Sequence, residues 1–227
     1  MHALHPFRLV IFSATLTAGE VSAQVIFTNP ITGTNPNTSS HYTTGQTVAV
    51  GLTVTGIGRG TGISGSNSND RYNASGWNSG SWATNDYFTW TVTPNSGYQL
   101  SLASFAYTGQ TSGTGPTSFE FRSGVDGFSS SIGTATATGT TITLSSGSFQ
   151  GLTTSLEFRL YGWGASSSGG TFSVNDFTFN GTVSAVPEPS TYAALAGAAA
   201  LGLAFWRRHH QRPTAPLAKI DQPRPLP

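Results

Sequence analysis

Apolar and polar residues alternate along most of the chain between residues 24 and 185. A period of two places successive side chains on opposite faces, which is typical of half-buried strands. The segments "TVAVGLTVT" at 47–55 and "YFTWTV" at 87–92 show the alternation most plainly. The predicted strands are residues 24–28, 47–55, 87–92, 98–107, 118–123, 140–146, 155–163 and 171–183.

Turn-forming residues separate these strands. The segments "TPNSG", "SGTGP", "GVDG" and "SSSGG" combine Gly, Pro, Asn, Asp and Ser, which favour tight turns. No stretch between residues 24 and 185 shows a sustained helical period. About eight or nine short strands at this spacing predict an all-β fold, an antiparallel β-sandwich of the jelly-roll or lectin-like kind.

The segment 56–85 has no clear strand pattern over thirty residues. A loop of that length is unusual in a compact domain unless it binds something or is disordered. It carries Tyr72, Trp77 and Trp82 among Asn, Ser and Gly. Sugar rings present apolar C–H faces that stack on aromatic rings, so these three side chains are candidates for glycan binding. The same side chains would equally serve to cap the hydrophobic core, and the sequence leaves both interpretations open.

The composition excludes several classes of function. Charged residues make up 8% of the chain, against about a quarter in a typical soluble protein. Residues 24–185 contain four arginines, no lysine and six carboxylates, a net charge of −2. Without a basic patch the domain does not bind nucleic acid, because phosphate neutralisation supplies most of that affinity. The absence of cysteine excludes disulfides and thiolate metal sites.

Candidate catalytic groups are sparse in this domain. His41 is its only histidine and lies in the polar segment "NTSSHYTTG", where we expect a solvated loop. Glu120 and Glu157 would suit glycoside hydrolysis if their strands were neighbours. Each begins an "EFR" triplet, however, so that Arg122 and Arg159 lie two residues on, on the same strand face. This pattern favours salt-bridged pairs on the surface, and we expect no enzymatic activity.

Calcium is the one candidate metal, and we otherwise expect no cofactor. The segment "NSNDRYN" at 67–73 offers several oxygen ligands of the kind that calcium prefers, although Asp70 is its only carboxylate. Asp176 in the last predicted strand is a second candidate ligand.

The N-terminus has the organisation of a secretory signal peptide. Arg8 supplies a positive charge, residues 9–19 form an apolar segment, and "VSA" places small residues ahead of a cleavage site between Ala23 and Gln24. The apolar segment is too short to span a bilayer. The alternative is a first core strand or helix. The prediction of a signal peptide implies export and cleavage by signal peptidase.

The C-terminus begins with Pro187-Glu188-Pro189, continues with fifteen uncharged residues at 192–206 and ends that stretch with Arg207-Arg208. Fifteen helical residues span about 22 Å, short of a hydrocarbon core of about 30 Å. We expect the two prolines to hold the backbone extended, outside the helix. Trp206 and the arginines suit a membrane interface with the tail in the cytoplasm. An Ala-rich helix packed on the domain is the alternative.

The stretch "VPEPSTYAALAGAAALGLAFWRR" resembles the PEP-CTERM sorting signal of Gram-negative bacteria in its triplet, short apolar helix and arginine cluster. The resemblance implies processing near the triplet by an exosortase and a surface or exopolysaccharide-associated protein. The domain ahead of it resembles the lectin-like sandwiches often found before this signal. Family members usually end soon after the arginines, whereas this chain continues with a Pro-rich, basic tail that we expect to be disordered.

Together these features predict a signal peptide at 1–23, an exported β-sandwich at 24–185, a sorting signal at 186–208 and a tail at 209–227. The expected protein is anchored transiently in the inner membrane through 192–206 and then placed at the cell surface or outside the cell. There it is a non-enzymatic component of the envelope or matrix. The alternative is a carbohydrate-binding module that recognises exopolysaccharide or environmental glycans.

Overall fold

The computed structural model describes residues 23–187 and 189–210 of the chain. The chain divides into two compact units, residues 1–184 and 185–227, and each is described by itself. The predicted signal peptide up to residue 22, Glu188, and the predicted tail beyond His210 lie outside the described residues.

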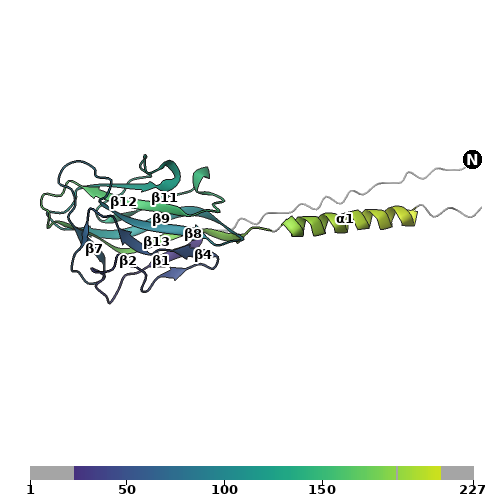
Figure 1. Cartoon of the computed structure of the whole chain (residues 1–227), viewed down its shortest axis with the longest axis horizontal. Coiled ribbons are helices and arrows are strands. Elements are labelled where there is room, and N and C mark those ends of the chain that lie inside the picture. The colour runs from purple at the N-terminus through teal and green to yellow at the C-terminus, as the bar shows by residue number, and fades with distance from the viewer. Residues whose placement is uncertain (1–22, 188, 211–227) are drawn as a thin grey trace, which may run out of the picture. The chain divides into compact units, whose positions relative to one another are not determined.

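The first unit consists of two antiparallel sheets (Figure 1). In the seven-stranded sheet the strand order is β11-β9-β13-β1-β3, and β7, which itself pairs with β6, pairs with β13. Its strands are β1 (Gln24–Asn29), β3 (Thr47–Val48), β6 (Ser64–Gly65), β7 (Tyr72–Ser75), β9 (Tyr98–Thr111), β11 (Gly139–Thr143) and β13 (Thr171–Ala185).

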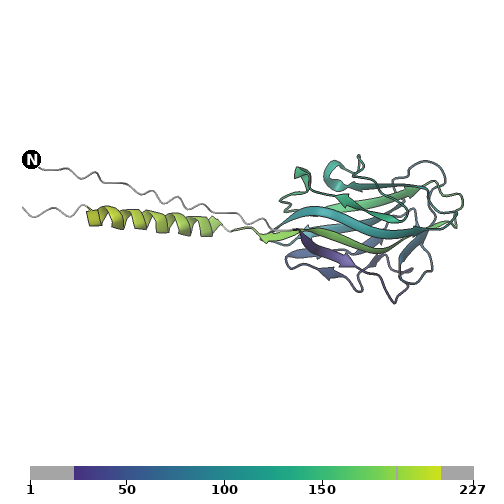
Figure 2. The same cartoon turned by 180° about the vertical axis from the view of Figure 1, so that it is seen from behind.

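The six-stranded sheet has the order β10-β12-β8-β5-β2, and β4 pairs with β8. Its strands are β2 (His41–Tyr42), β4 (Leu52–Val54), β5 (Ile57–Arg59), β8 (Tyr87–Pro94), β10 (Ser118–Ser123) and β12 (Leu156–Trp163). Two short 3-10 turns, η1 (Gly124–Asp126) and η2 (Gly147–Phe149), lie in the connections. In Figure 2 the purple β1 lies beside the green β13, with which it pairs. The predicted antiparallel β-sandwich is confirmed.

Aromatic rings hold the two sheets together. Phe105 of β9 stacks on Phe121 of β10, with ring centroids 4.5 Å apart. Trp90 of β8 meets Phe177 of β13 at 5.5 Å, edge to face. Rings in such geometries contribute attraction beyond the apolar area that they bury. The hydrophobic effect of this aromatic core therefore replaces the disulfides that the chain lacks.

In the two longest strands, β9 and β13, the buried positions switch from even-numbered to odd-numbered residues partway along the strand. In β9 the buried positions are Leu100 and Leu102, and then Phe105 and Tyr107. The same change from even to odd positions occurs in β13 between residues 174 and 177. Each strand thus keeps its apolar residues in the core only because its inward-outward alternation slips by one residue, as it does at a β-bulge.

The prediction of a single strand at 47–55 is wrong. The segment forms β3 in one sheet and β4 in the other. Between them Val50 is 84% exposed, and Gly51 adopts a φ of +83° that side-chain-bearing residues rarely tolerate. The apolar-polar alternation continues across this turn, and for that reason it concealed the change of sheet.

The prediction that 56–85 lacks strands is also wrong. The segment contains β5, β6 and β7, and the preceding β2 was not predicted either. These strands are two to four residues long and rich in Gly, Ser and Asn. Such short segments offer too few alternating positions for a pattern to register. The sandwich therefore contains thirteen strands within the described residues rather than eight or nine.

The second unit contains helix α1 (Pro189–His210). The helix has 22 residues, longer than the predicted stretch at 192–206. Pro189 is its first residue, which corrects the expectation that both prolines lie outside the helix. Proline is favoured at that position, because the first backbone N–H groups of a helix have no partner within it and φ is already suitable.

Candidate functional site

The processing segment connects the last strand to the helix. Pro187 is exposed and lies in neither strand nor helix, two residues after β13 ends at Ala185. Glu188 falls outside the described residues. An exposed proline outside regular secondary structure suits the cleft of a protease, because it needs no unfolding to enter.

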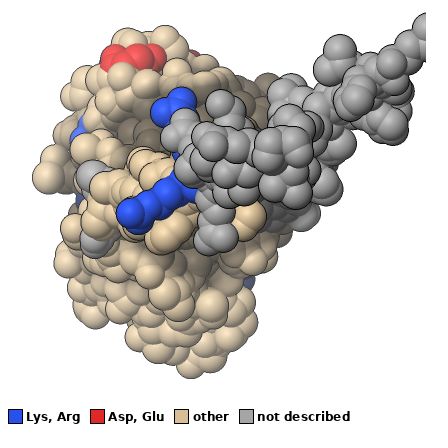
Figure 3. Space-filling model, turned by 90° about the vertical axis from the view of Figure 1, so that its right-hand side faces the viewer, with Lys and Arg blue, Asp and Glu red and all other residues tan. Residues whose placement is uncertain are grey.

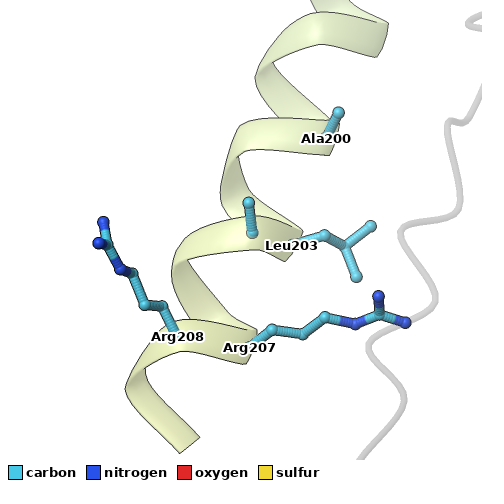
Figure 4. Close-up of a pocket in the computed structure, with 5 residues that line it drawn as sticks. Ala200, Leu203, Arg207 and Arg208 are labelled. Atoms are coloured by element: carbon cyan, nitrogen blue, oxygen red, sulfur yellow. The ribbon is translucent and has the colours of Figure 1, made fainter. Parts of the chain in front are cut away.

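Helix α1 exposes its large apolar side chains, including Leu195, Leu201, Phe205 and Trp206. Arg207 and Arg208 lie in its last turn, where cations interact favourably with the helix dipole. Figure 4 shows Arg207 extending on the same side of the helix as Leu203, and Arg208 on another side. Over residues 23–187 and 189–210, no helix combines the length and hydropathy needed to cross a membrane.

The predicted signal-peptidase site lies at the start of the sandwich. Ala23 and Gln24 are both exposed, and Gln24 is the first residue of β1. Cleavage between them would therefore leave every described strand intact.

Two of the three predicted glycan-binding aromatics are in the core. Tyr72 is fully buried in β7, and Trp77 is 2% exposed. The Trp77 ring meets Phe88 edge to face at 5.3 Å, and its Nε1 donates to the carbonyl of Ala74. Because neither ring presents a face to solvent, the prediction that they contact glycan is wrong. They anchor the 56–85 segment to the core, which was the other interpretation.

Arg59 is a partly buried residue whose role the sequence did not reveal. Its guanidinium lies 3.7 Å from the centre of the Tyr72 ring and donates to the carbonyls of Ser39 and Asn73. The Tyr72 hydroxyl donates to the carbonyls of Ser39 and Ser40. Burial lowers the pKa of Arg59, and burial raises the pKa of Tyr72 to about 12 although the nearby Arg59 opposes that shift. The pair fixes the connection before β2.

Trp82, the third predicted aromatic, is half-buried over the outer face of the six-stranded sheet. The guanidinium of Arg122 lies 4.5 Å from its ring centre, and the Tyr161 ring lies 5.3 Å away. Arg122 also pairs with Glu120 and donates to the carbonyls of Phe128 and Ser129. One face of the Trp82 ring is thus covered by an arginine that has its own partners.

Arg159 repeats this arrangement on the neighbouring strand. It pairs with Glu157 at 2.7 Å, and its guanidinium lies between the rings of Tyr87 and Phe128, 4.3 and 3.7 Å from their centres. Arg122 and Arg159 are directly opposite in the β10–β12 register, which would be unfavourable for uncompensated like charges. The predicted salt-bridged pairs are confirmed, and they hold η1 and its flanking loop on the sheet.

The remaining titratable groups lie apart. His41 is exposed in β2, opposite Gly58, rather than in a loop as predicted. Asp86 is buried, and its carboxylate accepts from the Asn78 backbone N–H at 2.8 Å. Burial raises the pKa of Asp86, and the hydrogen bond from Asn78 partly offsets the shift. Among the described residues, no three His, Cys, Asp or Glu side chains are grouped so that they could hold a metal ion.

The two candidate calcium ligands make separate contacts. Asp70 accepts from the backbone N–H of Gly33, and its own N–H donates to the carbonyl of Thr34. Asp176 on β13 accepts from the Thr108 hydroxyl of β9. Nothing in these contacts tests calcium binding, which stays a prediction.

An open hollow of about 290 Å³ lies on the outer face of the seven-stranded sheet. Strands β9, β11 and β13 supply its walls, and threonine hydroxyls predominate among the lining groups. The sequence did not single out these threonines, since Thr is frequent in every strand. Figure 3 shows another face of the molecule, on which most of the described surface belongs to uncharged residues.

Comparison with known proteins identifies the C-terminal segment. The family model of the PEP-CTERM protein-sorting motif matches residues 185–208. No curated protein and no solved structure matches the chain. The motif is an exosortase substrate signal, so the chain is an exported protein that an exosortase sorts. The predicted sorting signal is confirmed.

Proposed function

We propose that the protein is a non-enzymatic structural or adhesive component of the cell envelope or extracellular matrix, delivered there by exosortase processing. One observation carries the proposal. A PEP-CTERM motif at 185–208 follows directly on the last strand of a sandwich that has its own aromatic core. A domain that needs no partner to complete its core can be released and remain folded.

Two processing steps follow from this organisation. Signal peptidase cleaves between Ala23 and Gln24, at the edge of β1. The apolar stretch at 192–206 then holds the protein transiently in the inner membrane. The exposed apolar side chains of α1 and its terminal arginines support this role. The exosortase acts near Pro187 and releases the domain.

The contacts of the carboxylates support a non-enzymatic role. Glu120 and Glu157 are each engaged by an arginine on the same strand. Each carboxylate is therefore already held in an ion pair within the protein, whereas a glycosidase needs two carboxylates that face the scissile bond of its substrate.

The proposal is tested with a variant in which Pro187, Glu188 and Pro189 are all replaced by Ala, expressed in an exosortase-containing host. We expect wild-type protein at the cell surface and the variant retained uncleaved in the membrane fraction. The matched control is Pro213→Ala/Pro216→Ala, which changes two prolines of the tail. Equal surface display of the triple variant would contradict the proposal.

A carbohydrate-binding module is the second candidate function. It is favoured by the hydroxyl-lined hollow on the seven-stranded sheet. Binding of the mature domain to polysaccharide would explain adhesion within a matrix without any chemical step.

A further inference from the structure

The hollow on the outer face of the seven-stranded sheet lies where three strands meet. Thr141 of β11 is opposite Ala106 of β9, and Gly139 is opposite Thr108. The hydrogen bond from the Thr108 hydroxyl to Asp176 brings β13 alongside. A volume of about 290 Å³ is near the lower end of small-molecule sites, which suits one small polar ring rather than an extended apolar ligand.

The lining offers hydrogen-bonding groups that the protein itself leaves unused. Within the described residues, the hydroxyls of Thr138 and Thr141 have no hydrogen-bond partner and both side chains are exposed. One carboxylate oxygen of Asp176, Oδ2, accepts a hydrogen bond from the Thr108 hydroxyl, and the other, Oδ1, accepts none from any described residue. The hollow therefore presents one strong acceptor beside hydroxyls that both donate and accept.

The floor of the hollow is small and apolar. Ala106 contributes a methyl group, and Gly139 contributes no side chain. At Gly139 a Cβ atom would lie 2.1 Å from the carbonyl oxygen of Tyr107, and its φ is +100°, so glycine is required there. A ligand with both hydroxyls and C–H groups matches this combination of polar walls and apolar floor.

Hydroxyl groups continue from the hollow across the sheet. Thr178, which lines the hollow, is opposite Thr28, and their hydroxyl oxygens are 2.9 Å apart. Thr28 is in turn opposite Thr47 of β3. Neighbouring strands lie about 4.8 Å apart, so this row of three threonines leads from the hollow toward the edge of the sheet. A chain longer than one ring would find further hydroxyl partners along it.

The charge of the hollow restricts the class of ligand. Among the described residues that line it, Asp176 is the only charged one. Because no described lining residue is a cation, the Asp176 carboxylate disfavours acidic sugars and phosphates through like-charge repulsion, whereas it strengthens hydrogen bonds donated by neutral hydroxyls.

We propose that this hollow binds a neutral sugar unit of a polysaccharide, with Asp176 accepting a sugar hydroxyl and Thr141 bonding a neighbouring one. The proposal rests on the carbohydrate-binding function above and moves its site away from the aromatic residues of the 56–85 segment. The row at Thr178, Thr28 and Thr47 contacts the adjoining sugar units.

The test measures binding of the full chain, purified in mild detergent, to immobilised neutral polysaccharides: glucans, mannan, galactan and xylan. We expect at least one to bind, and alginate, an acidic polymer, to bind more weakly. Asp176→Asn should weaken that binding about tenfold, equivalent to about 1.4 kcal/mol. Thr141→Val, which keeps the shape and removes the hydroxyl, should weaken it severalfold.

Thr143→Val is the matched control, since Thr143 is exposed two residues along β11 on the same face and does not line the hollow. It should leave binding unchanged, and all three variants should melt within a degree or two of wild type. Binding that Asp176→Asn and Thr141→Val leave intact would overturn the site but not the function. No binding to any neutral polysaccharide would overturn both. Binding lost in EDTA and restored by calcium would show a metal between Asp176 and the ligand, contrary to the direct contact.

Discussion

At the scale of the residue, Arg59 and Tyr72 show how a domain of low charge uses a partly buried cation. The guanidinium satisfies carbonyls from two separate segments while it stacks on the Tyr72 ring. Because burial raises the pKa of Tyr72 to about 12, its hydroxyl remains a donor throughout the neutral range. The two residues thus stabilise a connection that has little regular structure of its own.

Tyr72→Phe removes the hydroxyl and keeps the ring. The Ser40 carbonyl then loses its donor, and the Ser39 carbonyl keeps only the one from Arg59. We expect the free energy of unfolding to fall by about 0.5–1.5 kcal/mol, as measured by urea denaturation. Tyr98→Phe is the control, because the hydroxyl of Tyr98 has no partner among the described residues. Equal effects of the two substitutions would contradict the role assigned to Tyr72.

Asp86 makes stability depend on pH. Because burial raises its pKa in the folded protein, its contribution to stability is fully present below the unfolded pKa and is lost as pH rises through the folded value. Asp86→Asn keeps an acceptor for Asn78 and cannot ionise. We expect the melting temperature of the variant, relative to wild type, to increase between pH 3 and pH 7.

Asp126→Asn should behave in the opposite way. Hydrogen bonds from Ser129 and Ser130 lower the pKa of Asp126. Its contribution is therefore present above the unfolded pKa and is lost as pH falls through the folded value. The melting temperature of the variant, relative to that of wild type, should decrease from pH 3 to pH 7. The same pH trend for both variants would show that the two carboxylates do not differ as described.

The functional residues were only partly predictable at this scale. The "EFR" triplets predict ion pairs because strand alternation places residues two apart on one face, and the structure shows both pairs. Tyr72 and Trp77 were ambiguous, since aromatic side chains in a Gly- and Ser-rich segment look alike whether they point inward or outward. Burial depends on the short strand β7, and that strand gave no pattern in sequence.

At the scale of the element, the turn between β3 and β4 decides which sheet each strand joins. Gly51 has φ +83°, and a Cβ there would lie 2.4 Å from the Tyr98 ring. Long alternating strands such as β8, β10 and β12 were predictable because each stays in one sheet. The division of the 47–55 segment was not predictable, because its apolar-polar alternation continues through the turn between β3 and β4. Only the positive φ of Gly51 marks that turn.

Gly51→Ala and Gly97→Ala separate backbone strain from steric overlap. Both positions have a φ near +80°, but a Cβ at Gly97 meets nothing within 4 Å. We expect Gly97→Ala to lower the free energy of unfolding by about 1–2 kcal/mol from backbone strain alone. Gly51→Ala should lose about 1–3 kcal/mol more, because the Tyr98 ring must move. If urea denaturation gives the same loss of unfolding free energy for both variants, the Tyr98 ring moves aside without cost and the assigned overlap is contradicted.

At the scale of the whole molecule, sequence predicts where the protein goes better than what it binds. The sorting motif is contiguous and consists of a Pro-Glu-Pro triplet, an apolar stretch and a positive flank, so one segment of sequence suffices to recognise it. The hydroxyl-lined hollow, in contrast, is assembled from β9, β11 and β13, which are far apart in the chain. No local pattern marks residues that become neighbours only across strands.

The central claim is that the domain is delivered after removal of its C-terminal sorting helix. The most direct test is the intact mass of the protein recovered from the surface of an exosortase-containing host. We predict a species that begins at Gln24, ends near Pro187 and therefore lacks the helical stretch from residue 192 to the end of the chain. A host without exosortase should not produce a species of that mass. A surface species that still carries Trp206 through Pro227 would contradict the account.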